Sequence, residues 1–323
     1  MSIPTIRLDE TDTEKVVKEL RAACVDVGFF YIEGHGIAPE LLEDVFRASK
    51  ELFALPVEEK KALSDPVMSR GYTAMQEETL DPSKQRIGDT KEGFYIGKDV
   101  PKDSEEYNPA KLAGPNMWPS ESLSPSMEDC DGFKETMNRY RAACSRVGLE
   151  VVRMLAQAIG LDDAHFFDQA FSNPIATTRL LHYADHKSDP EDGVFACGAH
   201  TDYGMITLLL TDENAGLQIR QLDGSWLDVP PKPQAFVVNL GDMLERWTNG
   251  LFRSTLHRVL TTNGAERYSI PFFYDPHFDT VVKVLDVCCS KENPPKYPPT
   301  TTGQHLLDKY KETHADFQPQ DEP

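Results

Sequence analysis

Residues 198–210, GAHTDYGMITLLL, join a His-x-Asp pattern to an apolar run with the composition of a β-strand. Side chains alternate between the two sides of an extended chain, so His200 and Asp202 lie on the same side. An imidazole and a carboxylate placed in this way can both bind one metal ion. The stretch therefore predicts a pair of metal ligands beside a β-strand at 205–210.

The His-x-Asp pattern occurs three times, at residues 200–202, 277–279 and 314–316. A site made of two histidines and one carboxylate needs a second, distant histidine and must leave positions open for substrate and O₂. Only the first occurrence is followed by a β-rich stretch with a further histidine, His257 in STLHRVL. His277 is followed only by His305 and His314, which lie in or near the expected terminal helix, and no histidine follows His314. The sequence therefore favours 200–202 together with His257.

A buried acid receptor is indicated a short way beyond His257. Arg267 and Ser269 open the apolar strand SIPFFY and share one of its faces. A guanidinium on an otherwise apolar face is unfavourable unless it meets a carboxylate. An arginine that binds a carboxylate through two hydrogen bonds, with a hydroxyl beside it, is a well-shaped acid receptor. Together, the five residues predict an iron centre with a dicarboxylate next to it.

The wider chain predicts a mainly β fold with flanking α-helices. After Pro174, short β-rich runs alternate with turns at a spacing of roughly ten residues, which is typical of a sandwich or barrel. The first half shows helical periodicity. Residues 64–130 lack periodicity and predict a long, folded-over loop region. The expected helices are 13–27, 39–55, 133–159 and 304–312. The expected strands are 29–32, 177–183, 205–210, 217–219, 225–229, 235–240, 254–260 and 267–274.

The expected organisation has three parts. Residues 1–170 form an N-terminal region of helices and edge strands, residues 171–290 form the β core, and residues 291–323 form a C-terminal helix and tail. Such a chain fits the usual range for one or two domains.

Composition narrows the possible partners. The 323 residues carry 33 Lys and Arg against 53 Asp and Glu, a net charge of −20. This charge disfavours nucleic acid and anionic membrane surfaces, so we expect a small-molecule substrate and a monomer or weak oligomer. No signal peptide or membrane span is visible, and the six cysteines form no CxxC pattern. A cytoplasmic, reduced protein is therefore the expectation.

With these motifs the sequence resembles the non-haem Fe(II), 2-oxoglutarate-dependent oxygenases, in the branch that contains isopenicillin N synthase and the plant dioxygenases. The likeness extends over nearly the whole chain and is carried by an ordered set of segments. They are GFFYIEGHGI (28–37), GAHTDYGMITLLL (198–210), NLGDMLERWTNG (239–250), STLHRVL and ERYSIPFF.

The resemblance implies a double-stranded β-helix, or jelly-roll, core with an N-terminal helical region. It implies that His200, Asp202 and His257 bind Fe(II), and that 2-oxoglutarate is anchored by Arg267 and Ser269. Tyr183 matches a tyrosine that often touches the same carboxylate. The family reaction consumes O₂, releases succinate and CO₂, and oxidises an unactivated C–H bond.

Four residues are candidates for the substrate pocket. Arg179 shares a strand face with Tyr183 and resembles an arginine of the ethylene-forming relatives. Tyr203, next to the metal motif, is similar to the residue that follows this motif in those same relatives. Tyr72 and Glu78 lie in the loop RGYTAMQEET (70–79), where Glu78 matches a substrate-contacting glutamate of the ethylene-forming and homoarginine-hydroxylating relatives. For Asp89, Lys91 and Glu92 a salt-bridged turn is the favoured interpretation, and Tyr95 is expected to be a packing residue.

These residues favour a small, amino-acid-like substrate that undergoes hydroxylation, desaturation or oxidative ring closure. Two alternatives remain at this point. In an oxidase of the isopenicillin N synthase type, Arg267 and Ser269 would hold a substrate carboxylate and no 2-oxoglutarate would be needed. In a non-catalytic jelly-roll protein, the same cavity would bind a small acid.

Overall fold

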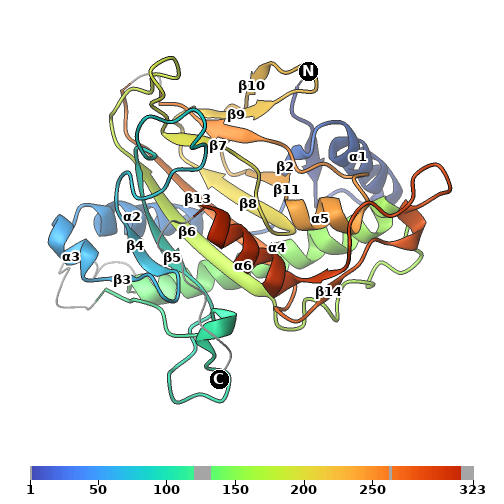
Figure 1. The fold of residues 1–323 in the computed structure, drawn as a ribbon, viewed down its shortest axis with the longest axis horizontal. Coiled ribbons are helices and arrows are strands. Elements are labelled where there is room, and N and C mark those ends of the chain that lie inside the picture. Colours follow the sequence, from blue (N-terminus) through green and yellow to red (C-terminus); the bar gives the residue numbers. More distant parts are fainter. Residues whose placement is uncertain (1, 120–131, 262–263, 314–323) are drawn as a thin grey trace.

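The computed structural model describes residues 2–119, 132–261 and 264–313. Its strands form a nine-stranded sheet in the order β1-β2-β11-β8-β13-β6-β5-β4-β3 and a four-stranded sheet in the order β10-β9-β12-β7 (Figure 1). The strands of the large sheet are β1 Thr5–Arg7, β2 Phe29–Glu33, β3 Ser64–Asp65, β4 Arg70–Thr73, β5 Lys91–Ile96, β6 Ile175–Tyr183, β8 Ile206–Thr211, β11 Phe236–Leu240 and β13 Arg267–Asp275. Those of the small sheet are β7 Cys197–His200, β9 Leu217–Arg220, β10 Trp226–Asp228 and β12 His257–Val259. A separate two-stranded antiparallel sheet pairs β14 Val281–Val282 with β15 Thr300–Thr301.

The two sheets share one buried apolar cluster, so they form the two layers of a sandwich. Strands β2, β6 and β11 contribute to this cluster from the large sheet, and β7, β9 and β12 from the small sheet. Its buried members include Phe29, Leu181, Ile219, Val237 and Val259. The space between the layers is therefore largely apolar, which raises the energetic demand on any charged side chain that enters it.

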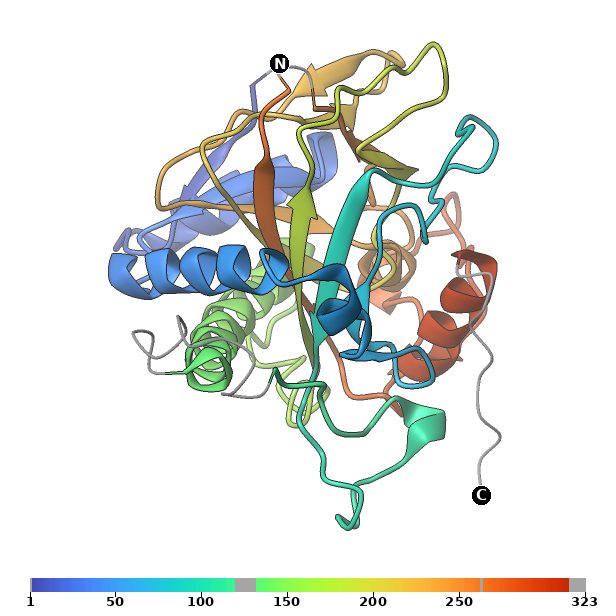
Figure 2. The same cartoon turned by 90° about the vertical axis from the view of Figure 1, so that its left-hand side faces the viewer.

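The helices pack mainly against the other face of the large sheet. Helix α4 (Phe133–Ile159) contacts both α1 (Thr13–Asp26) and α2 (Pro39–Phe53), and α2 and α4 also contact β6 and β13. Figure 2 shows α2 and α4 on one side of this sheet and α6 (Thr302–Thr313) on the other. Short helices lie at α3 (Val57–Lys61) and α5 (Asp242–Trp247), and 3₁₀ turns cover Pro109–Lys111 and Asp286–Cys288.

Local sequence explains where these elements begin and end. Asp12 caps α1, since its carboxylate accepts the Lys15 N–H at 3.1 Å. Helix α4 stops at Gly160, whose φ of +102° is a left-handed conformation that glycine adopts readily. Along β13, even-numbered side chains such as Ile270 and Phe272 join the core beneath the helices. The odd-numbered residues consequently face the interior of the sandwich.

The mainly β architecture with flanking helices is confirmed, and the helix expected at 133–159 is found with those bounds. The expectation of a loop region at 64–130 is wrong in part, because β3, β4 and β5 belong to the large sheet. Strand β5 was missed because KEGFYI begins with buried charged residues, which breaks the apolar alternation of a typical strand. The strand expected at 254–260 begins only at His257, and a helix, α5, occupies part of 239–250.

The described residues contain neither a disulfide bond nor a helix suited to a membrane. The five cysteines within the described residues are all free: Cys24, Cys144, Cys197, Cys288 and Cys289. Over the same ranges, no helix combines the length and apolarity that crossing a bilayer requires. The third His-x-Asp pattern, at 314–316, and Cys130 lie outside the described residues.

Candidate active site

His200, Asp202 and His257 come together at one end of the small sheet. Strands β7 and β12 run antiparallel, and His200 and His257 are direct partners in their register. Asp202 follows β7, and its Oδ1 lies 3.7 Å from the Nε2 atom of each histidine. One donor atom from each of the three side chains lies within 4.8 Å of the others. Three ligands at this spacing can hold one metal ion and leave positions open.

Hydrogen bonds orient all three side chains toward a common point. His200 Nδ1 lies 2.9 Å from the Gly198 carbonyl oxygen, and His257 Nδ1 lies 3.0 Å from the Thr255 carbonyl oxygen. Because a carbonyl can only accept, each Nδ1 carries the proton and each Nε2 presents a lone pair. Asp202 Oδ2 accepts hydrogen bonds from Thr207 and Asn239, which leaves Oδ1 turned toward the two imidazoles.

The electrostatics of the triad suit metal binding. Burial acts to raise the pKa of Asp202, but the nearby imidazoles of His257 and His200 and the hydrogen bonds to Oδ2 outweigh it, so the pKa is lowered. Burial, followed by the neighbouring His200, lowers the pKa of His257. An ionised carboxylate and neutral imidazoles are the protonation states that metal coordination requires.

Arg267 and Ser269 form an acid receptor inside the sandwich. Arg267 is 2% exposed, its Nε donates to the Asn214 carbonyl at 3.2 Å, and its Nη1 has no hydrogen-bond partner among the described residues. The buried Ser269 hydroxyl also lacks one there. The guanidinium lies 4.8 Å from the ring centroid of Tyr183, its register partner on β6. Two buried donors without partners fit the carboxylate of a dicarboxylic acid.

A pocket opens directly beside the triad, and His200 and Asp202 form part of its wall. Its other lining residues include Glu78, Tyr95, Arg179, Tyr203, Phe273 and Asp275. The pocket shares five lining residues with a larger outer cavity: Tyr95, Ile175, Thr177, Leu306 and Tyr310. Helix α6 supplies Leu306 and Tyr310 to both spaces, so it covers the approach to the metal centre.

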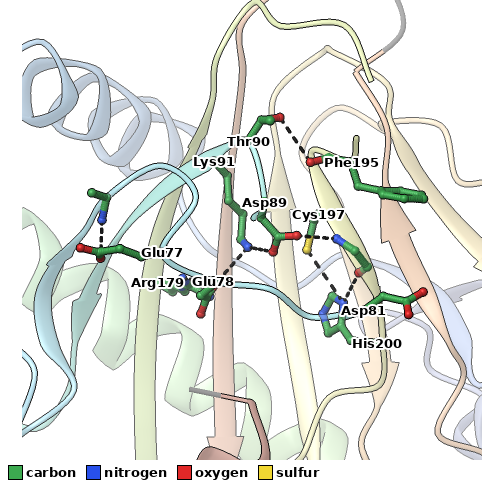
Figure 3. A network of polar contacts seen from close by, with 12 residues as sticks. Glu77, Glu78, Asp81, Asp89, Thr90, Lys91, Arg179, Phe195, Cys197 and His200 are labelled. Carbon is green, nitrogen blue, oxygen red and sulfur yellow. Dashed lines mark hydrogen bonds and ion pairs between the residues drawn. The ribbon is translucent and has the colours of Figure 1, made fainter. Parts of the chain in front are cut away.

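Charged groups of both signs meet in the wall of this pocket. Arg179 Nη2 lies 2.8 Å from Glu78 Oε2, and the Arg179 guanidinium stands 4.3 Å from the ring centroid of Tyr95. Figure 3 shows Lys91 reaching toward the same glutamate, with a distance of 2.8 Å between Lys91 Nζ and Glu78 Oε2. Arg179 Nε is buried and has no partner among the described residues. Asp275 accepts the Met205 N–H at 2.6 Å, and burial raises its pKa to about 7.

The structure therefore brings most of the expected site residues together. The exception is Tyr72, which the structure places outside the pocket lining. Its buried hydroxyl donates to Glu92 Oε2 at 2.6 Å, next to the Lys60 ammonium that binds the same oxygen. The turn expected at Asp89–Glu92 is corrected as well, because Lys91 and Glu92 are buried residues of β5.

Among the pocket residues that sequence reasoning missed, four have aromatic or acidic side chains. Tyr95 was expected to be a packing residue, but its side chain forms part of the wall. Phe273 and Asp275 follow Ser269 on the same face of β13, so extending the period-two pattern from Arg267 would have found them. Tyr310 had no sequence signal, because only packing of α6 across the opening brings it there.

Comparison with known proteins identifies the class to which this fold and site belong. The family model described as "non-haem dioxygenase in morphine synthesis N-terminal" matches residues 3–121, and the model described as "2OG-Fe(II) oxygenase superfamily" matches residues 174–276. The chain is 39% identical to the 2-oxoglutarate-Fe(II) type oxidoreductase hxnY of Emericella nidulans, over 97% of this chain and 88% of the relative. It is 38% identical to kihadalactone A synthase LFS of Citrus sinensis, over 98% and 93% of the two chains.

A solved structure agrees with this assignment. A full-length protein of Neurospora crassa, crystallised in complex with α-ketoglutarate and thymine, superposes with a TM-score of 0.82 at 31% identity, covering 96% of both chains. The chain therefore belongs to the 2-oxoglutarate- and Fe(II)-dependent oxygenases, and its sandwich is a double-stranded β-helix. It is an oxidoreductase whose cofactors are Fe(II), 2-oxoglutarate and O₂. This assignment disagrees with both alternatives, the non-catalytic acid-binding protein and the oxidase that needs no 2-oxoglutarate.

Proposed function

We propose that this oxygenase oxidises a C–H bond of a small, polar, amino-acid-like molecule. In this proposal His200, Asp202 and His257 hold Fe(II). Arg267 and Ser269, with Tyr183 beside them, hold the distal carboxylate of 2-oxoglutarate. Iron, O₂ and 2-oxoglutarate supply the oxidising chemistry, with succinate and CO₂ as co-products. The protein supplies ligand geometry, a carboxylate anchor and a pocket beside the metal ligands.

The anchor for 2-oxoglutarate rests on the two buried donors without partners. A buried donor that lacks a partner costs about 1–3 kcal/mol, and more when it is charged. Within the described ranges, no ion pair joins Arg267 to a carboxylate of the protein. A dicarboxylate that reaches from the metal to this arginine would satisfy Arg267 Nη1 and the Ser269 hydroxyl together.

The single observation that carries the substrate class is the mixed charge of the pocket wall. Arg179 keeps a buried N–H that no described residue accepts, while Glu78 and Asp275 place carboxyl oxygens in the same lining. A zwitterion has a carboxylate for the arginine and an ammonium for the acids. One relative is named for kihadalactone A and the Neurospora crassa structure contains thymine, so family membership alone leaves the substrate open.

A heterocyclic base is the second candidate, because the Neurospora crassa relative was solved with thymine bound. Aromatic rings are available for such a molecule, since Tyr95, Tyr203 and Tyr310 all line the pocket. A flat ring can stack on aromatic side chains, whereas an aliphatic amino acid gains little from them.

The experiment begins with metal-free protein under anaerobic conditions. Addition of Fe(II) and then 2-oxoglutarate is expected to give the weak visible charge-transfer band of the chelated keto acid. Succinate release in air is then measured with free amino acids, with the same compounds as methyl esters or N-acetyl derivatives, and with pyrimidine bases. We expect turnover with free amino acids that is lost when either charged group is blocked. Equal turnover of blocked and free compounds, or turnover with the bases alone, would contradict the amino-acid proposal.

Arg179→Gln provides a second test of the substrate class. It should raise KM for the amino acid at least tenfold and leave KM for 2-oxoglutarate within about twofold, because Arg179 lies in the substrate wall. Arg258→Gln is the matched control. This arginine belongs to β12 but stacks on Trp226 and hydrogen bonds to Gln218, away from the pocket.

A further inference from the structure

A neutral cluster of four buried charged residues adjoins the pocket. Glu78, Asp89, Lys91 and Arg179 are each 7% exposed or less. Lys91 Nζ contacts both Asp89 Oδ2 and Glu78 Oε2, and Glu78 in turn contacts Arg179 (Figure 3). Two cations and two anions balance, so the cluster is stable only as a set, because losing one member leaves a buried charge uncompensated.

The other end of the cluster reaches a bulge in β7. His200 pairs with His257 and Cys197 pairs with Val259, so β7 takes three steps where β12 takes two. The extra residue in β7 interrupts the ladder just before His200. A bulge leaves backbone groups that need partners from elsewhere.

Asp89 supplies such a partner. Its Oδ1 accepts the Gly198 N–H at 2.8 Å and the Gln85 side-chain amide at 2.8 Å. The Gly198 carbonyl in turn accepts the Nδ1–H of His200 at 2.9 Å. Asp89 therefore binds the N–H of Gly198, and the carbonyl of the same glycine fixes the ring of His200. A side chain at position 198 would push aside the Gln85 amide, which also binds Asp89 Oδ1.

We propose that Asp89, held by Lys91, is a positioning residue for His200. The chain of contacts runs from the pocket wall at Arg179 and Glu78, through Lys91 and Asp89, to the Gly198 peptide and the imidazole. The inference rests on the proposed role of His200 as an iron ligand. It goes further by assigning a task to two residues that line neither the metal site nor the pocket.

The expected effect is on metal affinity and ligand geometry. Groups that orient a metal ligand typically contribute 10- to 100-fold to metal affinity when they are removed. The double variant Asp89→Ala/Lys91→Met removes one charge of each sign, so the remaining Glu78–Arg179 pair stays balanced. We expect it to bind Co(II) at least tenfold more weakly than wild type and to shift the visible d–d absorption of the bound ion.

A second buried ion pair, between α3 and the same strand β5, provides the control. Lys60 Nζ lies 2.7 Å from Glu92 Oε2, both residues are about 5% exposed, and Glu92 neighbours Lys91 on β5. The double variant Lys60→Met/Glu92→Gln should lower the urea midpoint of unfolding about as much as Asp89→Ala/Lys91→Met does, because each variant removes one buried ion pair. Since Glu92 and Lys60 bond to Tyr72, His182 and the Phe53 carbonyl rather than to Gly198, the Co(II) affinity and spectrum of this variant should match wild type.

The measurement is a Co(II) titration of the metal-free full chain, followed by visible absorption. Asp89→Asn serves as a milder variant, because its amide oxygen can still accept the Gly198 N–H while the charge opposite Lys91 is lost. Its affinity should fall between those of wild type and the double variant. Wild-type affinity and spectrum in the folded double variant would overturn the proposal, because that variant loses the acceptor of the Gly198 N–H.

His200→Ala separates the two levels of inference. If it binds Co(II) as wild type does, the proposed iron site itself is wrong. If it loses Co(II) while the Asp89 variants keep wild-type affinity and spectrum, the iron site stands and only the positioning role fails.

Discussion

His200 and His257 face each other across two antiparallel strands, with ring centroids 4.3 Å apart. Their opposition depends on the register of β7 against β12, because a slip of one residue would turn one imidazole to the other side of the sheet. The bulge in β7 lies directly beside this pair. The backbone in this stretch therefore determines whether two distant histidines can share one ion.

The first prediction concerns which His-x-Asp pattern binds iron. Asp202→Ala should abolish turnover and weaken Fe(II) binding at least 100-fold, because it removes the one anionic ligand of the triad. Asp279→Ala is the control, since Asp279 is an exposed residue whose carboxylate pairs with Lys111 at 2.8 Å. Anaerobic Fe(II) titration measures both. An equal loss of Fe(II) affinity in the two variants, or no loss in either, would refute the assignment of Asp202 as an iron ligand.

The second prediction concerns the 2-oxoglutarate anchor. Arg267→Gln should raise KM for 2-oxoglutarate about 100-fold or more, because a charged hydrogen bond in a buried site is lost. Ser269→Ala should raise it about tenfold, as expected for a neutral hydroxyl. The keto-acid charge-transfer band should need correspondingly more 2-oxoglutarate to form, while Fe(II) affinity stays unchanged. A normal 2-oxoglutarate requirement in Arg267→Gln would show that the acid binds elsewhere.

The third prediction concerns stability. Glu78→Gln should lower the free energy of unfolding by about 3 kcal/mol, because Lys91 and Arg179 would both lose a buried counter-ion. Glu77→Gln should change it by less than about 1 kcal/mol, since Glu77 is exposed and accepts the Ala74 N–H at the surface. Urea unfolding of the metal-free proteins gives both values. Similar losses in the two variants would argue against the buried cluster.

The fourth prediction is a pH dependence at Asp275. Burial raises its pKa to about 7, whereas an unfolded aspartate titrates near 3.9. The unfolded state therefore loses its proton first, so the contribution of Asp275 to stability falls as pH rises from about 4 to 7. Relative to Asp275→Asn, metal-free wild type should become less stable across this window by a few kcal/mol, at about 1.4 kcal/mol per pKa unit.

Asp168 should contribute to stability with the opposite pH dependence, so it serves as the comparison. A hydrogen bond from Arg153 lowers the pKa of this partly exposed carboxyl to about 2. Its contribution to stability is present above pH 4 and is lost as pH falls toward 2. Urea midpoints for Asp168→Asn and Asp275→Asn between pH 3 and 8 should therefore diverge from wild type in opposite directions. A pH-independent difference between wild type and Asp275→Asn would contradict the raised pKa.

Local pattern was enough to predict the candidate metal and acid-binding residues. His200 with Asp202, and Arg267 with Ser269, are pairs two residues apart on extended chain, and period-two geometry places each pair on one side whatever the rest of the fold does. The helix at 133–159 was equally local, because an apolar stripe at helical spacing and a terminal glycine define it. His257 could be added because the chain offers few histidines in β-rich sequence.

Tertiary structure alone decided how the charged residues are partnered. Glu78 and Arg179 are about a hundred residues apart, and no spacing rule predicts that one carboxylate would be shared between Arg179 and Lys91. Tyr72 and Glu78 come from the same short stretch, yet only Glu78 reaches the pocket, because β4 directs the tyrosine toward Glu92. Periodicity fixes the side of a strand on which a residue lies, whereas its partner depends on strand order and register across the whole sheet.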